Sequence, residues 1–245
     1  IPPASRHTFT REFRNVDTRQ ARVILVEAGP RLLPALPEPL SEAAKRDLEE
    51  LGVEVRLNTM VTAVEEGGVR LGDQHVAAAT VLWAAGNAAS PLGTMLGVPL
   101  ERGGRIRVAP DLSLPGHPEV FVIGDLALIE DRGRTVPAVA PAAMQQGRAA
   151  ARNVVRSFLG APRAPFRYVD KGDLATIGRN KAVASFGRGK LQLRGRIAWW
   201  FWLLLHIAYL AGFRNRASVM LQWAYSYFTY QRGARIVTER DQASR

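Results

Sequence analysis

One carboxylate in this chain follows an apolar segment directly, in a place where an acidic side chain can hold a cofactor. Residues Val120–Asp125 read as an apolar strand that ends in Gly124 and Asp125. A glycine lets a ligand approach the backbone closely. The carboxylate can accept hydrogen bonds from the hydroxyl groups of a polyol or a ribityl chain. A glycine after a strand is also an ordinary turn signal.

Glu27 ends a second apolar segment, Arg22–Glu27, which we expect to be a strand buried on both faces as in parallel sheets. In a dinucleotide-binding unit, an acidic residue there accepts hydrogen bonds from the adenosine ribose, and its charge disfavours a 2′-phosphate. The alternative is a solvated carboxylate at a strand end. The Gly-rich phosphate loop of such a unit lies about 20 residues earlier. Residues 1–28 contain no glycine, so we expect that loop to precede Ile1.

A helix with small residues near its start is expected from Pro141 to about Leu159. Proline suits the first turn of a helix. The free N–H groups and the dipole at this end offer partial positive charge to an electron-rich ring system. Gln145 and Gln146 are neutral donors and acceptors on this helix, and a solvated polar face is the alternative explanation, above all for Gln146.

The elements that must position these residues predict an α/β fold. Ser41 looks like the N-cap of a helix over Glu42–Leu51, and Gly52 is its stop signal. Apolar, β-branched segments predict the other elements: strands at Val53–Leu57, Val81–Ala84 and Arg105–Val108, and a meander over Val61–Val64 and Val69–Leu71 that turns at Gly67 and Gly68.

Charge divides the chain into two parts. Residues 1–150 carry 16 Lys and Arg against 18 Asp and Glu, whereas residues 151–245 carry 17 against 4, a net charge of +13. A basic tail favours a polyanionic partner, either an anionic membrane surface or nucleic acid. Four of the five tryptophans lie in the tail, within apolar runs and not among arginines. This pattern favours lipid over nucleic acid.

Ala161–Pro165 reads as a linker, and the segment after it favours membrane association. Arg196–Phe213 is strongly apolar but is shorter than the ~20 residues of a spanning helix and is interrupted by His206. An interfacial or re-entrant segment is therefore expected, followed by a second aromatic-rich helix over Ala217–Tyr230. His206 is either a functional ionisable group or a hydrogen-bonded structural histidine. Four arginines flank the apolar run as candidate headgroup anchors: Arg194, Arg196, Arg214 and Arg216.

The chain has no cysteine, which excludes disulfides, dithiol chemistry and thiolate metal sites. We expect no metal. It begins at Ile1 and not at Met, which predicts a fragment or a processed product.

Taken together, the motifs resemble those of the type II NADH dehydrogenases, the membrane-associated, non-proton-pumping NADH:quinone oxidoreductases. The segments that carry the resemblance span nearly the whole chain: Arg22–Arg31, Val81–Gly86, Val120–Asp125, Pro141–Asn153, Lys171–Gly178, Ala198–Trp202 and Tyr227–Ile236. The resemblance implies part of a Rossmann-like flavoprotein with two dinucleotide-binding domains and a C-terminal helical membrane-associating region. Residues 1–80 would then be the remainder of the NADH-binding domain, 81–160 the C-terminal part of the FAD-binding domain, and 161–245 the membrane-associating region.

The resemblance also implies cofactors and roles. A hydride would pass from NADH to FAD, and two electrons would then pass to a membrane quinone. The flavin carries this chemistry while protein groups position it, so no side chain is needed as a nucleophile or general base. Glu27 would bind NADH, Asp125 the ribityl chain of FAD, and a further set would lie beside the cofactors: Ala85, Gly86, Gly124, Ala140, Ala142 and Gln145.

By the same resemblance, the helix that begins near Pro141 lies between flavin and quinone, which makes Gln145 and Gln146 candidates on the quinone side. The common family pattern Ala-Gln-x-Ala-x-Gln is altered, because Pro141 stands where the first glutamine would fall. The partners implied are NADH, quinone and the cytoplasmic face of the cell membrane, bound peripherally by residues 166–245. Nucleic acid is not expected, and a homodimer is left open.

Two alternatives remain. Sulfide:quinone oxidoreductases share the fold and the tail but use cysteines, and the absence of cysteine argues against them. The chain could also be a non-catalytic, membrane-binding remnant, because it lacks both Gly-rich dinucleotide loops. We expect the isolated chain to be inactive.

Overall fold

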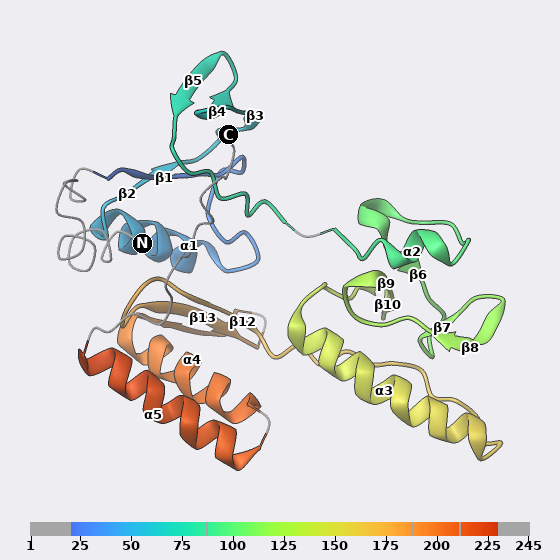
Figure 1. The fold of residues 1–245 in the computed structure, drawn as a ribbon. Coiled ribbons are helices and arrows are strands. Elements are labelled where there is room, and N and C mark those ends of the chain that lie inside the picture. Colours follow the sequence, from blue (N-terminus) through green and yellow to red (C-terminus); the bar gives the residue numbers. More distant parts are fainter. Residues whose placement is uncertain (1–20, 87, 188, 211, 230–245) are drawn as a thin grey trace, which may run out of the picture. The chain divides into compact units, whose positions relative to one another are not determined.

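The computed structural model describes residues 21–229 except 87, 188 and 211. The chain forms two compact units (Figure 1). Unit 1 comprises the described residues before Thr80 together with those from Gly172 onward, and unit 2 comprises residues 80–171. Each unit is described by itself.

Unit 1 begins with a β–α–β element. Strands β1 (Val23–Val26) and β2 (Val53–Arg56) pair in parallel, and helix α1 (Glu38–Glu50) connects them. The parallel strand ending at Glu27 is thus confirmed, although its side chains are half-buried. Gly52, with a φ of 85°, ends the helix region as expected.

The expected N-cap at Ser41 is wrong. Helix α1 begins earlier, after Pro37, because Pro39 fits the first turn and starts the helix there. Ser41 is therefore inside the helix and buried, and its hydroxyl donates a hydrogen bond to the carbonyl oxygen of Leu32.

An antiparallel meander follows. Strands β3 (Val61–Glu65), β4 (Gly68–Leu71) and β5 (Gln74–Ala77) pair in sequence order. Gly67, with a φ of 80°, occupies the first turn, as the sequence predicted, whereas β5 was not expected.

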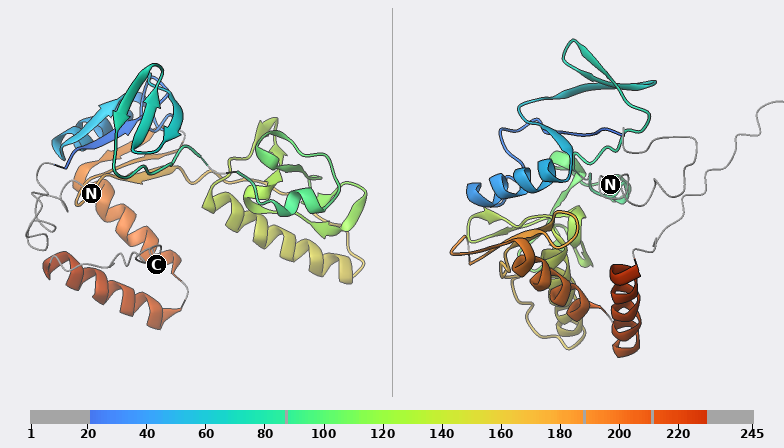
Figure 2. Two further views of the ribbon diagram at one scale, coloured as in Figure 1. Left: turned by 45° about the horizontal axis from the view of Figure 1, so that its top comes forward. Right: turned by 90° about the vertical axis from the view of Figure 1, so that its left-hand side faces the viewer.

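The C-terminal part of unit 1 is a second antiparallel sheet of β12 (Asp173–Thr176), β13 (Ala182–Phe186) and β14 (Leu191–Arg194). Helix α4 (Gly195–Tyr209) follows β14 directly, and α5 (Phe213–Thr229) comes next. Helices α1 and α4 lie on opposite faces of this sheet (Figures 1 and 2). Side chains alternate along β13: Val183 packs toward α1, whereas Ala182 and Ala184 pack with Ala198 of α4.

Unit 2 consists of short strands and one long helix. Its strands form three pairs: β6 (Ile106–Arg107) with β9 (Ala127–Leu128), β7 (Ser113–Leu114) with β8 (His117–Phe121), and β10 (Glu130–Asp131) with β11 (Arg134–Thr135). Its helices are α2 (Leu92–Met95) and α3 (Ala140–Phe158), with short 3-10 turns η4 (Arg102–Gly104) and η5 (Gly124–Leu126). Helix α3 covers the core, in which Ile106, Leu112 and Val136 are almost fully buried.

Two expected strands differ. Val81–Ala84 is not a strand, and its Leu82 and Trp83 are 73% and 64% exposed. A strand buried on both faces needs a hydrogen-bonded neighbour on each side, and none of the described residues pairs with this segment. The strand expected at Val120–Asp125 lies earlier, at His117–Phe121, because β8 pairs with β7 in a hairpin and is not the centre of a parallel sheet.

Candidate functional site

A hydrogen bond joins the Gly-Asp turn of unit 2 to helix α3. The Gly124 N–H donates to Oε1 of Gln146 at 2.6 Å, and Gln146 is only 2% exposed. Gly124 has a φ of 71°, a backbone conformation that glycine adopts without a Cβ penalty. The buried glutamine therefore has a structural partner, and its amide fixes the turn that carries Asp125.

Asp125 presents an available carboxylate. The residue is exposed in η5, and none of the residues described here forms a hydrogen bond or an ion pair with its side chain.

The N-terminus of α3 has fewer free N–H groups than its sequence suggested. Pro141 has no N–H, and the amides of Ala142 and Ala143 both donate to the carbonyl oxygen of Val139. The predicted group of free N–H donors at the start of α3 is therefore mostly absent.

Gln145 binds the backbone of the segment that follows α3. Its Nε2 donates to the carbonyl oxygen of Val169 at 3.0 Å, and the Val169 N–H donates to its Oε1 at 2.9 Å. The Gln145 amide thus binds both the N–H and the carbonyl of one residue, the pair of backbone groups that a neighbouring strand would bind in a sheet. We call residues 163–169 the strap, because this extended segment is bound to unit 2 along its length.

Asp131 holds the middle of the strap. Its carboxylate accepts a hydrogen bond from Arg167 at 2.7 Å and one from the Tyr168 N–H at 3.0 Å. Its side chain is only 7% exposed. The hydrogen bond from Arg167, together with that from the Tyr168 amide, lowers the pKa of Asp131 below its ordinary value despite the burial that opposes this.

Asn153 holds the start of the strap. Its amide accepts a hydrogen bond from the Ala164 N–H at 3.0 Å and donates to the carbonyl oxygens of Ala164 and Asp111. Arg163 donates to Ser157 and to the Pro118 carbonyl, and pairs with Asp111 at 3.3 Å. Burial would raise the pKa of Asp111, but hydrogen bonds from Ser113 and Arg163 lower it overall. The second half of the expected linker Ala161–Pro165 is therefore bound to the rest of unit 2, and Phe166 is part of the core.

Glu27 lies in unit 1, at the carboxyl end of β1. Its Oε1 accepts a hydrogen bond from the Gly29 N–H at 2.7 Å. Its backbone N–H and carbonyl bind Arg56 and Thr59 at the end of β2. The carboxylate is thus oriented by a local turn at the end of a parallel strand pair, where open α/β sheets bind ligands.

The remaining predicted site residues lie in unit 2 and differ in accessibility. Ala85, Gly86 and Ala140 are exposed, and Gly86 has a φ of 105°. Ala142 is 1% exposed and belongs to the core of unit 2. Its side chain therefore packs inward in this structure, whereas the other three residues are open to solvent.

His206 has a structural partner. Its Nδ1 lies 2.8 Å from the Trp202 carbonyl oxygen, and its ring lies 4.3 Å from the Trp202 ring. Trp202 in turn stacks on Trp223 of α5, with 5.7 Å between ring centroids. Of the helices in the described part of the chain, none combines the length and the apolar character needed to cross a membrane.

Apart from Gln145, the sequence did not single out the residues that hold the strap. Asn153 entered only as the end of a family-like segment, and Asp111, Asp131 and Val169 did not enter at all. A signal exists for Asn153 alone, because a polar amide among the alanines of a helix suggests a buried hydrogen-bonding role.

Comparisons with known proteins agree with the fold. The sequence model of the pyridine nucleotide-disulphide oxidoreductase family matches residues 9–147, and that of the NDH2 C-terminal domain matches residues 171–230. Two type II NADH:quinone oxidoreductases of Mycobacterium tuberculosis, Ndh and NdhA, are 39% and 40% identical over 100% and 97% of this chain. The chain spans about half of their length, 54% and 52% respectively.

A solved structure extends the likeness to three dimensions. NDH2 of Plasmodium falciparum, in complex with NADH, superposes with a TM-score of 0.81 at 16% identity, over 96% of this chain and 63% of that one. At this identity the match supports the fold alone. The two family models carry the assignment, since one covers more than half of the chain and the other most of its remainder. The chain therefore belongs to the pyridine nucleotide-disulphide oxidoreductase family and, within it, to the type II NADH dehydrogenases.

Proposed function

We propose that this chain is part of an FAD-dependent NADH:quinone oxidoreductase. Its relatives in M. tuberculosis and Haemophilus influenzae are named type II NADH:quinone oxidoreductases, and the P. falciparum neighbour was solved with NADH. A further neighbour with the same fold is an FAD-dependent pyridine nucleotide-disulphide oxidoreductase of Desulfovibrio vulgaris. The chain's share of the activity follows from the side chains that it contributes.

The residues at the Gly-Asp turn fit FAD. Asp125 is an exposed carboxylate without a partner among the described residues, and it can accept hydrogen bonds from ribityl hydroxyl groups. Gly124 leaves its neighbourhood open, since a Cβ there would meet only Ala143, at 3.8 Å. When bound, FAD supplies the acceptance of a hydride and the onward transfer of two electrons. The chain supplies orientation: Gln146 holds Gly124, and Gly124 holds Asp125.

The proposed roles of the other residues follow from their contacts. Glu27 selects NADH over NADPH, because a carboxylate repels a 2′-phosphate. Gln145 positions the strap on the quinone side and does not need to contact quinone, because both ends of its amide bind Val169. Ala85, Gly86 and Ala140 provide accessible backbone near the cofactors. Ala142 acts through the packing of α3.

The observation that carries the proposal is the Asp125 carboxylate, unpaired within the described part of the chain, beside a glycine held by a buried glutamine. The test compares the 245-residue chain with the longest protein that its gene encodes. We expect the longer protein to show a flavin absorbance band and to reduce a quinone analogue with NADH, and the 245-residue chain to do neither. A longer protein without flavin would overturn the proposal, and would favour the alternative of a non-catalytic membrane-binding protein.

We further propose that residues 166–245 attach the protein peripherally to the cytoplasmic face of the cell membrane. Support comes from one face of α4, where Ile197, Trp200, Phe201 and Leu204 are all exposed, at the spacing of a helical stripe. The opposite side of α4 packs on the sheet through Ala198. The tail also carries the net charge of +13. Assembly as a homodimer is part of the same proposal, since symmetric dimers are the commonest oligomers.

A salt series with vesicles tests the attachment. Arginine attraction to anionic lipid is screened by salt, whereas burial of apolar side chains is not. High salt should therefore release the chain from anionic vesicles only partly, and the triple variant Ile197→Asn/Trp200→Ser/Leu204→Asn should be released fully. The control is Met60→Asn, an exposed apolar residue outside the tail. Absence of vesicle binding at low salt would contradict the attachment. A nucleic-acid-binding tail would instead show no preference for vesicles and would lose its nucleic-acid partner steeply as the salt concentration rises.

A further inference from the structure

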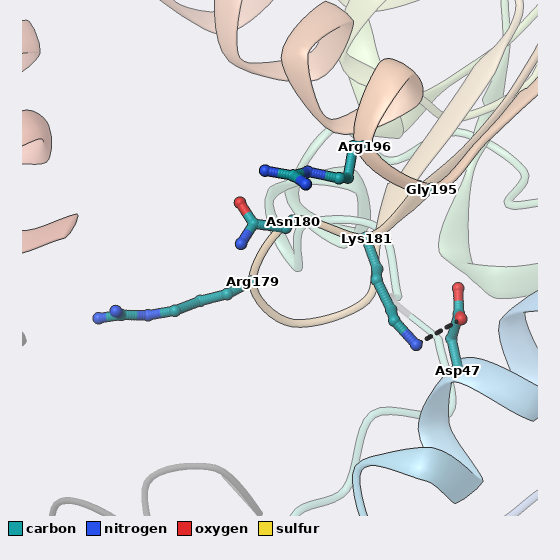
Figure 3. A pocket seen from close by; sticks show the side chains of 6 residues that line it. All are labelled: Asp47, Arg179, Asn180, Lys181, Gly195 and Arg196. Carbon is teal, nitrogen blue, oxygen red and sulfur yellow. Dashed lines mark ion pairs between the residues drawn. The ribbon is translucent and has the colours of Figure 1, made fainter. Parts of the chain in front are cut away.

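A hollow in unit 1 gathers positive charge where the C-terminal sheet meets helix α4. It is lined by three cationic side chains, one carboxylate, one amide and one glycine: Arg179, Lys181, Arg196, Asp47, Asn180 and Gly195. The side chains of Arg179, Asn180 and Arg196 extend into the same open space, whereas Lys181 points away toward Asp47 (Figure 3). Lys181 is therefore set apart from the two arginines by its contact with Asp47.

The backbone of this hollow is fixed on both sides. Between β12 and β13 the chain closes a tight turn, in which the Ile177 N–H donates to the Lys181 carbonyl at 2.8 Å. Gly178, with a φ of 72°, lies against α1, because a Cβ there would come within 3.0 Å of Leu51. Ile177 is buried in the core that α1 shares with this sheet. The turn that carries Arg179 and Asn180 is thus held against a helix.

Strand register brings α4 to the same end of the sheet. Arg194, the last residue of β14, pairs with Val183 near the start of β13. Helix α4 begins at the next residue, so Arg196 lies beside the β12–β13 turn. The first turn of α4 contains no acidic residue that could neutralise it. The sheet thereby brings Arg179 and Arg196 to the same hollow, although they are 17 positions apart in the sequence.

The two carboxylates nearby both face Lys181. Lys181 forms an ion pair with Asp47 at 2.9 Å and a hydrogen bond with Glu50. These contacts raise the pKa of Lys181, and the hydrogen bond that Lys181 donates to Glu50 contributes most. Arg196, in contrast, has no ion pair or hydrogen bond to any residue within the described ranges. An anion that entered the hollow would meet the Arg196 guanidinium with Arg179 on the same side, while the Asp47 and Glu50 carboxylates face Lys181.

We propose that this hollow binds a phosphate group, held by Arg179 and Arg196 with the Asn180 amide as a further donor. Guanidinium groups match the oxygens of phosphate in geometry and charge. The phosphate belongs either to the headgroup of an anionic phospholipid or to a free phosphate anion. The lipid source rests on the proposed attachment of the tail to a membrane, because the exposed stripe of α4 begins at Ile197, next to Arg196. The free anion does not depend on it.

The test uses the full chain and two charge-matched double variants. Arg179→Gln/Arg196→Gln removes the proposed ligands. Arg134→Gln/Arg152→Gln removes two exposed arginines of unit 2 and serves as the control. One arm measures inorganic phosphate binding by phosphorus NMR line broadening. The other measures co-sedimentation with phosphatidylcholine vesicles that contain phosphatidylglycerol, against vesicles of phosphatidylcholine alone.

We expect each arginine of the hollow to contribute about fivefold in affinity, and the control variant to bind free phosphate as the wild type does. A selective loss in the phosphate arm alone identifies free phosphate as the ligand, and a selective loss in the vesicle arm alone identifies the lipid headgroup. Equal losses in both double variants would show diffuse charge attraction and overturn the proposal, as would unchanged binding in the hollow variant. If no form of the chain binds vesicles, the membrane proposal fails, and the phosphate arm still decides whether the hollow is a site.

Discussion

Gln145 and Val169 exchange two hydrogen bonds, one in each direction between a side-chain amide and a backbone peptide. The contact joins the first half of α3 to the end of the strap. It assigns Gln145 a partner inside unit 2, although its sequence context suggested contact with quinone. The same helix holds the turn of Asp125 through Gln146. Adjacent glutamines thus position two different segments.

Substitution of Gln145 should loosen the end of the strap. Each lost hydrogen bond contributes about 0.5–1.5 kcal/mol, so Gln145→Ala should speed hydrogen exchange of the Val169 amide by at least about fivefold. Gln145→Glu retains the acceptor for the Val169 N–H but places a carboxylate against the Val169 carbonyl. The Val169 amide of this variant should therefore be less protected from hydrogen exchange at neutral pH than at an acid pH that protonates the glutamate. Unchanged exchange at Val169 in both variants would show that the contact is not maintained in solution.

Removal of the Asp125 carboxylate should weaken FAD retention in the longer protein. A hydrogen bond to a charged group contributes roughly 1.5–3 kcal/mol, so Asp125→Ala should lose flavin on dialysis, and Asp125→Asn should lose less. The flavin-to-protein absorbance ratio measures this. Asp73→Ala, which removes an exposed carboxylate in unit 1, is the control. Full retention of flavin by Asp125→Ala would limit Asp125 to a structural role.

Neutralising Glu27 should reduce the preference for NADH. Repulsion between two charges near 4 Å in water is about 1 kcal/mol, so Glu27→Gln should lower the ratio of kcat/KM for NADH over NADPH by about fivefold. The Gly29 N–H can still bind the amide oxygen of the glutamine, which keeps the local turn. Glu42→Gln, an exposed residue of α1, is the control. An unchanged ratio would remove Glu27 from the nucleotide site.

Acid should release the middle of the strap. The pKa of Asp131 is lowered in the folded state, chiefly by the hydrogen bond from Arg167, from an ordinary value of 3.8. A lowered pKa means that the folded state binds the proton less readily than the unfolded state. The stabilisation is therefore complete above pH 3.8 and is lost as the pH falls through the lower, folded value. Hydrogen exchange of the Tyr168 amide across this range measures it, and Asp131→Asn should remove the pH dependence.

Local sequence signals predicted much of unit 1. Three of its features were predicted and confirmed: the apolar strand β1, the helix end at Gly52 and the glycine turn of the meander. Each depends on residues that are close together in the sequence. The start of α1 was missed because a proline in the first turn was a stronger signal than a serine. The β12–β14 sheet was not predicted, because its middle strand Ala182–Phe186 is short and alanine-rich and lacks the strongly β-branched pattern of β1.

The surroundings of the candidate site were predicted in part. Gly124 and Asp125 do lie beside α3, as their order in the sequence indicated. The contacts of Asp131 and Asn153 could not be predicted, because each joins residues that are 11 to 42 positions apart and no local pattern encodes such pairs. At Val81–Ala84 a local pattern was present but the expected strand was not found. An apolar run predicts burial but does not supply the neighbouring strands that burial requires.

The sharing of one core by α1 and the C-terminal sheet has a consequence for the order of folding during synthesis. Lys181 and Glu50, which meet at this core's edge, are 131 positions apart. Unit 2 is a single continuous segment between them and can fold as soon as it leaves the ribosome. Helix α1 must wait with Leu40 and Ala44 uncovered until Ile177 and Val183 are made. Helix α1 therefore needs protection from aggregation in the nascent chain until the C-terminal sheet has been made.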